Sequence, residues 1–224
     1  MASHGRNDAH YSRLRLNLTS DRIKILNSMI DPLYGPVYDL CCDHGRLGLS
    51  ALEKGAYVIF NDRERHLVDK VESNLSNHRP ELISRARFQV GDASKINFPE
   101  KSQIIIAGVG NKLMEKIISR ITPQQQCRLL LGVQRRSVEL RSWLHGAGWK
   151  LECEKLAVER GRYREILQLS RQGHEIEAIG SFHESLPTLR LDFYNEMRRH
   201  FSMIRELPEG ISHLLSSKVE QITK

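Results

Sequence analysis

The chain has 224 residues, 40% of them hydrophobic and 27% charged, which is enough for one sizeable domain with a real core plus a smaller appendage. No run approaches the roughly 18 apolar residues of a membrane span, and the first residues lack the apolar centre of a secretory signal, so a cytoplasmic protein with no membrane partner is expected. The four cysteines have no Cys-x-x-Cys spacing, so neither a metal site nor a disulfide framework is expected.

Positive charge is concentrated in one stretch of the chain. The formal net charge is +7, and residues 120–171 hold eleven lysines or arginines against five acidic residues. Residues 181–224 hold six of each sign, so the excess is expected on the folded domain rather than on a basic tail. This placement is consistent with a surface that binds a polyanion, and a solvated basic face with no partner explains it equally well.

The first predicted elements are a helix, a strand and a second helix. Residues 18–30 have a candidate N-cap at Thr19 or Ser20 and apolar positions at helical spacing, which predicts an amphipathic helix. A loop containing two prolines follows, then an apolar strand at 37–41 and a helix from about 46 to 54. Gly55 can end that helix.

Strands and helices continue to alternate beyond Gly55. The patterns predict strands at 56–60, 86–90, 104–108 and 128–133, helices at 63–77, 111–120 and 137–146, and a final strand pair at 149–158 and 162–169. Five parallel strands that finish with an antiparallel hairpin are typical of class I methyltransferases, whereas a dinucleotide dehydrogenase would close with another parallel strand. The predicted fold is therefore α/β and Rossmann-like, with a seven-stranded, mostly parallel sheet.

Two more helical patterns follow the hairpin. They cover residues 188–206 and 210–223 and are separated by Pro208 and Gly210. The chain is therefore predicted to divide into a Rossmann-like domain at 1–172 and a two-helix appendage at 173–224.

Three acidic residues at the predicted strand ends indicate a cofactor site for S-adenosylmethionine (SAM). Asp39 would hold the amino group of SAM, Asp62 the ribose hydroxyls and Asp92 the adenine amine. Each acid by itself is more often an N-cap or turn residue, and it is the joint spacing that favours ligand binding. Neighbouring residues complete the predicted site: Cys41, His44, Gly45, Arg63, Gly91, Ala93, Ala107 and Gly108.

Cys41 occupies a place where a nucleotide-binding loop usually has glycine. Its side chain narrows the loop, which argues against a pyrophosphate and is tolerable for SAM, which has no phosphate. The adjacent Cys41 and Cys42 are compatible with a redox switch or with small packing residues in a tight turn, and the second interpretation is the simpler.

The methyl-transfer edge is expected at Ile106-Ala-Gly-Val-Gly-Asn111, which follows the fourth strand. Asn111 either contacts substrate or caps the following helix. Asp43 is the preferred catalytic residue. His44 beside it is a candidate acid or base, but a histidine in a turn more often has a structural role or contacts the ligand loop.

Arginines dominate the segments predicted to meet the substrate. Arginine suits phosphate groups and an aromatic ring suits bases, although an exposed, charged hairpin is also what a solvated edge looks like. The RNA-binding candidates are Arg22, Gln134, Arg135, Arg136, Arg160, Arg162 and Tyr163.

Several motifs together resemble the bacterial tRNA (adenine-N1) methyltransferase family that acts on adenine 22, the TrmK family. They include Asp39-Leu-Cys-Cys-Asp-His-Gly45, Ile105-Ile-Ala-Gly-Val-Gly110, Leu140-Arg-Ser-Trp-Leu144 and Arg162-Tyr-Arg-Glu-Ile166, and the resemblance spans residues 18–169. It implies a SAM-binding domain, a tRNA substrate and a C-terminal helical appendage that helps to hold tRNA. The family pattern differs at Cys41, at Asn111 and at Gln134-Arg-Arg, so the acceptor is open to question.

The resemblance and the candidate residues lead to a mechanism with two rivals. The N1 atom of adenine has a lone pair and no proton to lose, so proximity and orientation suffice, and Asp43 would stabilise the positive charge that develops. The rivals are a non-catalytic SAM- or RNA-binding protein of the same fold and a methyltransferase with another acceptor. Oligomeric state is left open.

Overall fold

A computed structural model describes residues 22–134, 137–203 and 210–223. Within these ranges one seven-stranded sheet has the order β3-β2-β1-β4-β5-β7-β6. Its strands are β1 (Val37–Leu40), β2 (Val58–Asp62), β3 (Ala86–Val90), β4 (Lys101–Ala107), β5 (Gln126–Val133), β6 (Lys150–Glu159) and β7 (Arg162–Ser170). Strands β1 to β5 pair in parallel, and β7 is antiparallel to both β5 and β6. The predicted sheet and its antiparallel end are confirmed.

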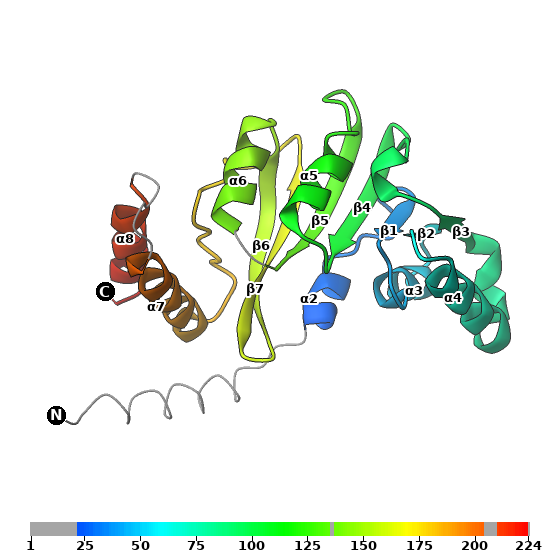
Figure 1. Ribbon diagram of the computed structural model, residues 1–224, viewed down its shortest axis with the longest axis horizontal. Coiled ribbons are helices and arrows are strands. Elements are labelled where there is room, and N and C mark those ends of the chain that lie inside the picture. Colours follow the sequence, from blue (N-terminus) through cyan, green and yellow to red (C-terminus); the bar gives the residue numbers. More distant parts are fainter. Residues whose placement is uncertain (1–21, 135–136, 204–209, 224) are drawn as a thin grey trace.

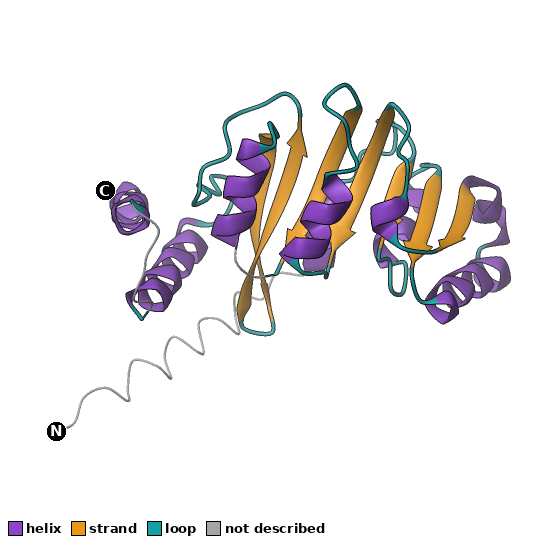
Figure 2. Ribbon diagram, turned by 45° about the horizontal axis from the view of Figure 1, so that its top comes forward, coloured by secondary structure: helices purple, strands orange, loops and turns teal. Residues whose placement is uncertain are grey.

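Helices cover both faces of this sheet, because successive side chains of a strand point to opposite faces. Helices α2 (Arg22–Ser28), α3 (Arg46–Glu53) and α4 (Arg65–His78) share one hydrophobic cluster with Ile105 of β4. Helices α5 (Asn111–Ile118) and α6 (Ser137–Gly146) share another with Ile104 and Ile106, and they lie in front of the sheet in Figure 2. Burial on both faces explains why β4 is a continuous apolar run.

The strand order places a switch point at β1. Strand β1 pairs with β2 on one side and with β4 on the other. The chain runs outward from β1 to β2 and β3, then crosses back to β4 and continues to β5 in the other direction. In open α/β sheets, ligands bind at the carboxyl ends of the strands next to such a point. The functional site is therefore expected where β1, β2 and β4 end.

Helices α7 (Pro187–Ser202) and α8 (Ile211–Thr223) lie beside β6 and β7, at the opposite end of the sheet from β3 (Figure 1). A third hydrophobic cluster joins Leu156 and Val158 of β6 to Phe182, Phe193 and Leu215. The division at 172/173 stays a prediction, and residues on both sides of it contribute to this cluster. No helix of the described ranges is long and apolar enough to cross a membrane.

A buried ion-pair network reinforces that junction. The guanidinium of Arg141 in α6 is fully buried and donates to Glu154 at 2.6 Å and to Glu165 at 2.8 Å. The other oxygen of Glu154 accepts from the backbone N–H groups of Ser181 and Phe182. Burial alone lowers the pKa of Arg141, but the two carboxylates outweigh it and raise that pKa above its ordinary value. The network thus ties α6, β6 and β7 to the segment that leads into α7.

Element boundaries differ from the prediction in a few places. Strand β2 lies at 58–62 rather than 56–60, because the polar Asn61 and Asp62 belong to its register and pair with Gln89 and Val90. Strand β4 begins three residues before the predicted 104, and 3-10 turns at Pro80–Arg85 and Ala93–Lys95 were not predicted. Helix α2 covers part of the predicted 18–30, and its candidate N-caps lie outside the described residues.

Candidate active site

The turn after β1 has an unusual backbone. Cys41, Asp43 and Gly45 have φ angles of 53°, 50° and 67°. A left-handed conformation costs a non-glycine residue roughly 1–2 kcal/mol, so two such residues in one turn indicate a functional constraint. The backbone N–H of Cys42 donates to Asn61 O at 3.0 Å, which joins this turn to β2.

Asp62 holds the same turn from the side of β2. Its Oδ2 accepts from the backbone N–H of Asp43 at 3.1 Å, and its Oδ1 accepts from that of Glu64 at 3.0 Å. The carboxylate is largely buried at the carboxyl end of its strand. Asp62 therefore fixes the turn after β1 from the end of β2, and its contact with a ribose stays a prediction.

Asp39 is the most strongly perturbed acid of the site. Its Oδ2 accepts from the backbone N–H of Gly48 at 2.8 Å, and the residue is 3% exposed. Burial raises its pKa to about 7, against the lowering effect of the Gly48 N–H, and the charge of Asp62 adds to the increase. A Cβ on Gly48 would lie 2.3 Å from Phe60 Cε1, so glycine is what lets α3 pack this closely.

Asp92 lies at the end of β3 and caps the short turn that follows. Its Oδ1 accepts from the backbone N–H and the hydroxyl of Ser94, and Lys116 lies 3.7 Å from its Oδ2. These hydrogen bonds, followed by the charge of Lys116, lower its pKa. Gly91 has open space where a Cβ would be, whereas Ala93 is buried.

Asn61 is a residue that the sequence interpretation missed. Its fully buried side chain donates to Gln89 O at 3.0 Å and to Gly91 O at 3.2 Å, which fastens the ends of β2 and β3 together. Its polar side chain inside an otherwise apolar strand was the available signal, because buried amides need hydrogen-bond partners.

The end of β4 provides the open side of the site. Gly108 has a φ of 88°, Ala107 is half-buried, and Gly110 has open space where a Cβ would be. Asn111 is the first residue of α5, and Gly110 occupies the N-cap position, so the N-cap interpretation of Asn111 is not what the structure shows.

Arg22 and Arg164 share one carboxylate beside this edge. Arg22 Nε lies 3.2 Å from Glu159 Oε1, and Arg164 Nε lies 3.4 Å from Glu159 Oε2. Arg164 also donates to the carbonyl oxygen of Gln134 at 3.1 Å, which holds the loop after β5. Glu159 was not among the predicted site residues, and alternation of charge along the hairpin was its only sequence signal.

The remaining RNA candidates occupy different surroundings. Arg160, in a left-handed conformation, and Arg162 are exposed on the β6–β7 hairpin. Tyr163 is half-buried, and its ring centroid lies 5.5 Å from that of Phe193 in an edge-to-face arrangement. Arg135 and Arg136 lie outside the described residues.

His44 and Arg63, the two basic candidates of the cofactor loops, are exposed. His44 Nε2 lies 3.7 Å from Asp43 Oδ1, and Arg63 Nε lies 3.8 Å from Glu64 Oε1. Asp43 is itself exposed, so its carboxylate is accessible to a ligand. No group of three or more His, Cys, Asp and Glu side chains in the described residues is arranged to hold a metal ion.

The two adjacent cysteines are poor redox groups. Both thiols are free, and burial, followed by the charges of Asp62 and Asp39, raises the pKa of Cys41 to about 11. Burial also raises the pKa of Cys42. Because the thiolate is the reactive form, these shifts favour the packing role. Each cysteine packs against a main hydrophobic cluster.

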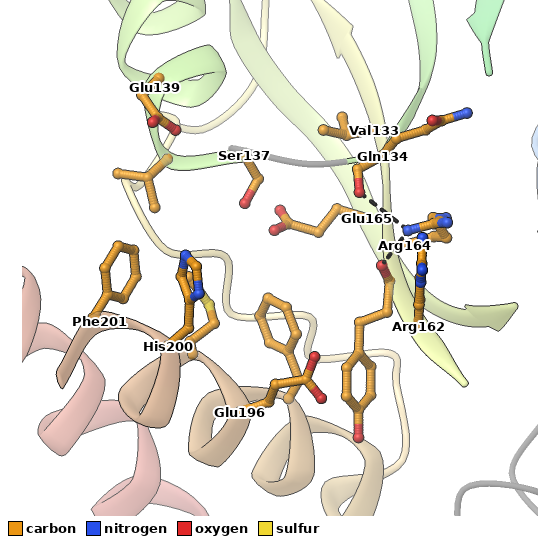
Figure 3. Close-up of a pocket in the computed structure, with 14 residues that line it drawn as sticks. Val133, Gln134, Ser137, Glu139, Arg162, Arg164, Glu165, Glu196, His200 and Phe201 are labelled. Atoms are coloured by element: carbon orange, nitrogen blue, oxygen red, sulfur yellow. Dashed lines mark hydrogen bonds between the residues drawn. The ribbon is translucent and has the colours of Figure 1, made fainter. Parts of the chain in front are cut away.

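A cavity of about 840 Å³ lies on the other side of β5 from these loops. Figure 3 shows its lining, which comes from the end of β5, the start of α6, β7 and α7. Gln134, Arg162 and Tyr163 are the predicted substrate residues that line it. The cofactor candidates at the ends of β1, β2 and β4 do not line it.

Together, the switch-point sheet, its antiparallel last strand and the acidic loops define a class I methyltransferase fold. Consistent with this, a family model described as "Methyltransferase domain" matches residues 19–167. The chain belongs to that family. A search of curated protein sequences finds no match.

Solved structures from bacteria share this fold. TrmK of M. capricolum in complex with S-adenosyl-homocysteine is 12% identical, with a TM-score of 0.67 over 92% of this chain and 96% of that one. The m1A22 tRNA methyltransferase TrmK of B. subtilis is 19% identical, with a TM-score of 0.62 over 91% and 97%. Sp1610 of Streptococcus pneumoniae in complex with S-adenosyl-L-methionine is 20% identical, with a TM-score of 0.65 over 92% and 98%.

Proposed function

We propose that this protein binds SAM and transfers its methyl group to N1 of an adenine in tRNA, at position 22. The observation that supports SAM binding is that the turn at 41–45, which follows β1, is hydrogen-bonded to Asp62 and its neighbour at the end of β2. Open space at Gly91 and Gly110 leaves room for a ligand between these loops and the end of β4. The solved structures with SAM or its product bound, over nearly the whole chain length, support the same proposal.

The residues present fit the chemical groups of SAM. Asp39 would pair with the positively charged amino group of SAM. That cation would in turn favour the ionised form of the buried Asp39 carboxyl. Asp62 would accept from the ribose hydroxyls, and Asp92 from the adenine amine. Small or glycine residues at 45, 91, 93, 107 and 108 would let the backbone approach the ligand, with Cys41, His44 and Arg63 around it.

When bound, SAM supplies a methyl group on a sulfonium centre. The protein then has to place N1 of the base in line with that methyl group, since N1 attacks with its own lone pair and needs no base to remove a proton. Asp43, exposed in the strained turn, would stabilise the positive charge that the base acquires. Asn111, at the start of α5, would orient the base from the side of β4.

The tRNA part of the proposal is supported by the arginines of the carboxyl edge. Arg160 and Arg162 are exposed on the hairpin, and Arg22 and Arg164 lie behind them around Glu159. Exposed arginines there can neutralise phosphates. A tRNA substrate also implies that the protein works in the cytoplasm. The TrmK structures covered almost end to end by this chain favour tRNA over other acceptors.

The test is incubation of the purified protein with labelled SAM and unmodified bacterial tRNA transcripts, followed by nucleoside analysis. We expect 1-methyladenosine, and its loss when adenine 22 is replaced by guanine. SAM binding measured by calorimetry on the same preparation is the control. Binding of SAM without transfer to tRNA would contradict the proposed reaction and favour a binding protein or another acceptor, as the departures at Cys41 and Asn111 allow.

A further inference from the structure

The cavity between β7 and α7 has walls suited to a planar, partly polar group. Phe193, Met197 and Phe201 of α7 and Tyr163 of β7 supply apolar and aromatic surface. The α7 residues that line it recur three and four positions apart, so one face of this helix forms the wall. A volume of about 840 Å³ lies within the range of small-ligand sites.

Polar groups are distributed among these apolar walls. Gln134 and Ser137 line the cavity from the loop after β5 and the start of α6, and Glu196 and His200 line it from α7 (Figure 3). These side chains offer both donors and acceptors to the edge of a bound base. The wall is therefore not simply a hydrophobic patch.

Two charged groups of the cavity wall, Glu165 and Arg164, are already paired. Glu165 is paired with the buried Arg141 at 2.8 Å, and Arg164 with Glu159 at 3.4 Å. An uncharged planar ligand can therefore enter without leaving these ions unpaired. What remains for recognition is the apolar wall and the polar side chains around it.

Arginines flank the cavity on the side of the β6–β7 hairpin. Arg160 and Arg162 are exposed on the hairpin next to one wall. Positive groups beside an aromatic-walled cavity match a chain of phosphates with one base turned inward.

We infer that this cavity accepts one unpaired nucleobase of the RNA substrate, outside the methyl-transfer site, while the flanking arginines contact the adjoining phosphates. The inference rests on the proposed function and extends it, because the residues of the cavity are distinct from the cofactor residues at the ends of β1, β2 and β4. Single-stranded loops are where RNA bases are free to turn outward and stack on aromatic side chains. The cavity would thus hold a loop nucleotide beside the target adenine.

Two substitutions test the cavity itself. Met197→Trp fills it and Phe201→Ala removes part of its wall, while Met203→Ala, which is 77% exposed beyond the end of α7, is the matched control. The probes are an unmodified tRNA transcript, a ten-nucleotide oligoadenylate and an RNA duplex of the same length. We expect Met197→Trp and Phe201→Ala to weaken tRNA and oligoadenylate binding roughly tenfold, with duplex and SAM affinity unchanged.

A third substitution tests the flanking charge. Arg162→Ala removes an exposed arginine at the cavity. The slope of the logarithm of tRNA affinity against the logarithm of salt concentration should then become shallower by about one. Filling the cavity should leave that slope unchanged. This difference separates base recognition from phosphate contacts.

The outcomes also separate this inference from the proposed function. Unchanged affinity in a folded Met197→Trp protein, checked by its unfolding temperature, would overturn the inference even if tRNA is methylated. Equal losses for oligoadenylate and duplex would overturn it too, since they indicate phosphate contacts alone. If the wild-type protein binds no RNA, both the inference and the proposed function are overturned. If the cavity variants bind oligoadenylate more weakly but the wild-type protein transfers no methyl group, the inference is supported and only the proposed reaction is overturned.

Discussion

The carboxyl edge of the sheet has two halves of opposite character. At the ends of β1, β2 and β3, acidic residues are held in tight turns, and backbone N–H groups are their main partners. Beyond β5, arginines predominate, and carboxylates from other elements hold them. One half suits a cationic cofactor with hydroxyl groups, and the other suits a polyanion.

This contrast also shows how each half is built. The acidic half depends on contacts between neighbouring strand ends, such as Asp62 with the turn after β1. The basic half includes a pair of partners far apart in the sequence, Arg22 and Glu159. Substitution of Asp62 or Asp43 should therefore change cofactor binding or turnover, whereas substitution of the buried Arg141 should change stability.

The largest effect is expected from Arg141→Met. The substitution leaves Glu154 and Glu165 buried without their cation, which should reduce the free energy of unfolding by about 3–5 kcal/mol. Urea unfolding followed by circular dichroism measures it. Arg79→Met, which breaks only exposed ion pairs with Glu53 and Glu81, is the matched control and should change stability little. Equal effects of the two substitutions would contradict the structural role of the buried network.

Asp62→Asn should reduce SAM affinity by roughly ten- to a hundredfold. The amide can accept from only one of the two backbone N–H groups that Asp62 now holds, and it is a weaker partner for ribose hydroxyls. Calorimetric titration with SAM measures the change. Asp69→Asn, an exposed residue on α4, is the control. If SAM affinity were retained, Asp62 would be only a brace for the turn.

Asp43→Asn addresses the reaction rather than binding. If its carboxylate stabilises the charge on the methylated base, turnover on tRNA should decrease about tenfold or more, while SAM affinity changes less. Single-turnover methyl transfer at saturating SAM gives the rate, with Asp69→Asn again as control. Unchanged turnover would remove Asp43 from the mechanism.

The pH dependence of stability should depend on Asp39. Burial raises its pKa to about 7 from 3.8, so the folded protein holds a proton on Asp39 in that interval that the unfolded chain has lost. The stability contributed by this proton is fully present below pH 3.8 and is lost as the pH rises through 7. Asp39→Asn cannot ionise, so relative to wild type it should be more stable at pH 8 than at pH 5. Urea unfolding at both values measures this, and a difference that does not vary with pH would contradict it.

The sequence predicted the sheet well because its elements are marked locally. Apolar runs such as the one at 104–106 and helical periodicity identify strands and helices without knowledge of their partners. The predicted strand at 86–90 and helix at 137–146 coincide with β3 and α6. The predicted strand at 56–60 stops short of Asn61 and Asp62, which lie within β2 because they continue its pairing with β3.

Residues that act through distant partners were harder to predict. Arg22 was expected to bind RNA, and the structure shows it paired with Glu159. Tyr163 was expected among the arginines of the hairpin, and its ring lies against that of Phe193. Neither contact follows from spacing, because the partners are 137 and 30 residues away. How Arg22 and Tyr163 act on RNA stays a prediction, and their surroundings are now defined.

By itself, the sequence determined the order of strands and helices, the antiparallel end of the sheet and the acidic loops, since local periodicity and turn residues encode these features. Only the tertiary structure decided which charges are paired, that Asp39 is buried enough to raise its pKa, and that α7 closes a cavity against β7. Burial and ion pairing depend on which distant segments meet, and a one-dimensional pattern does not specify that.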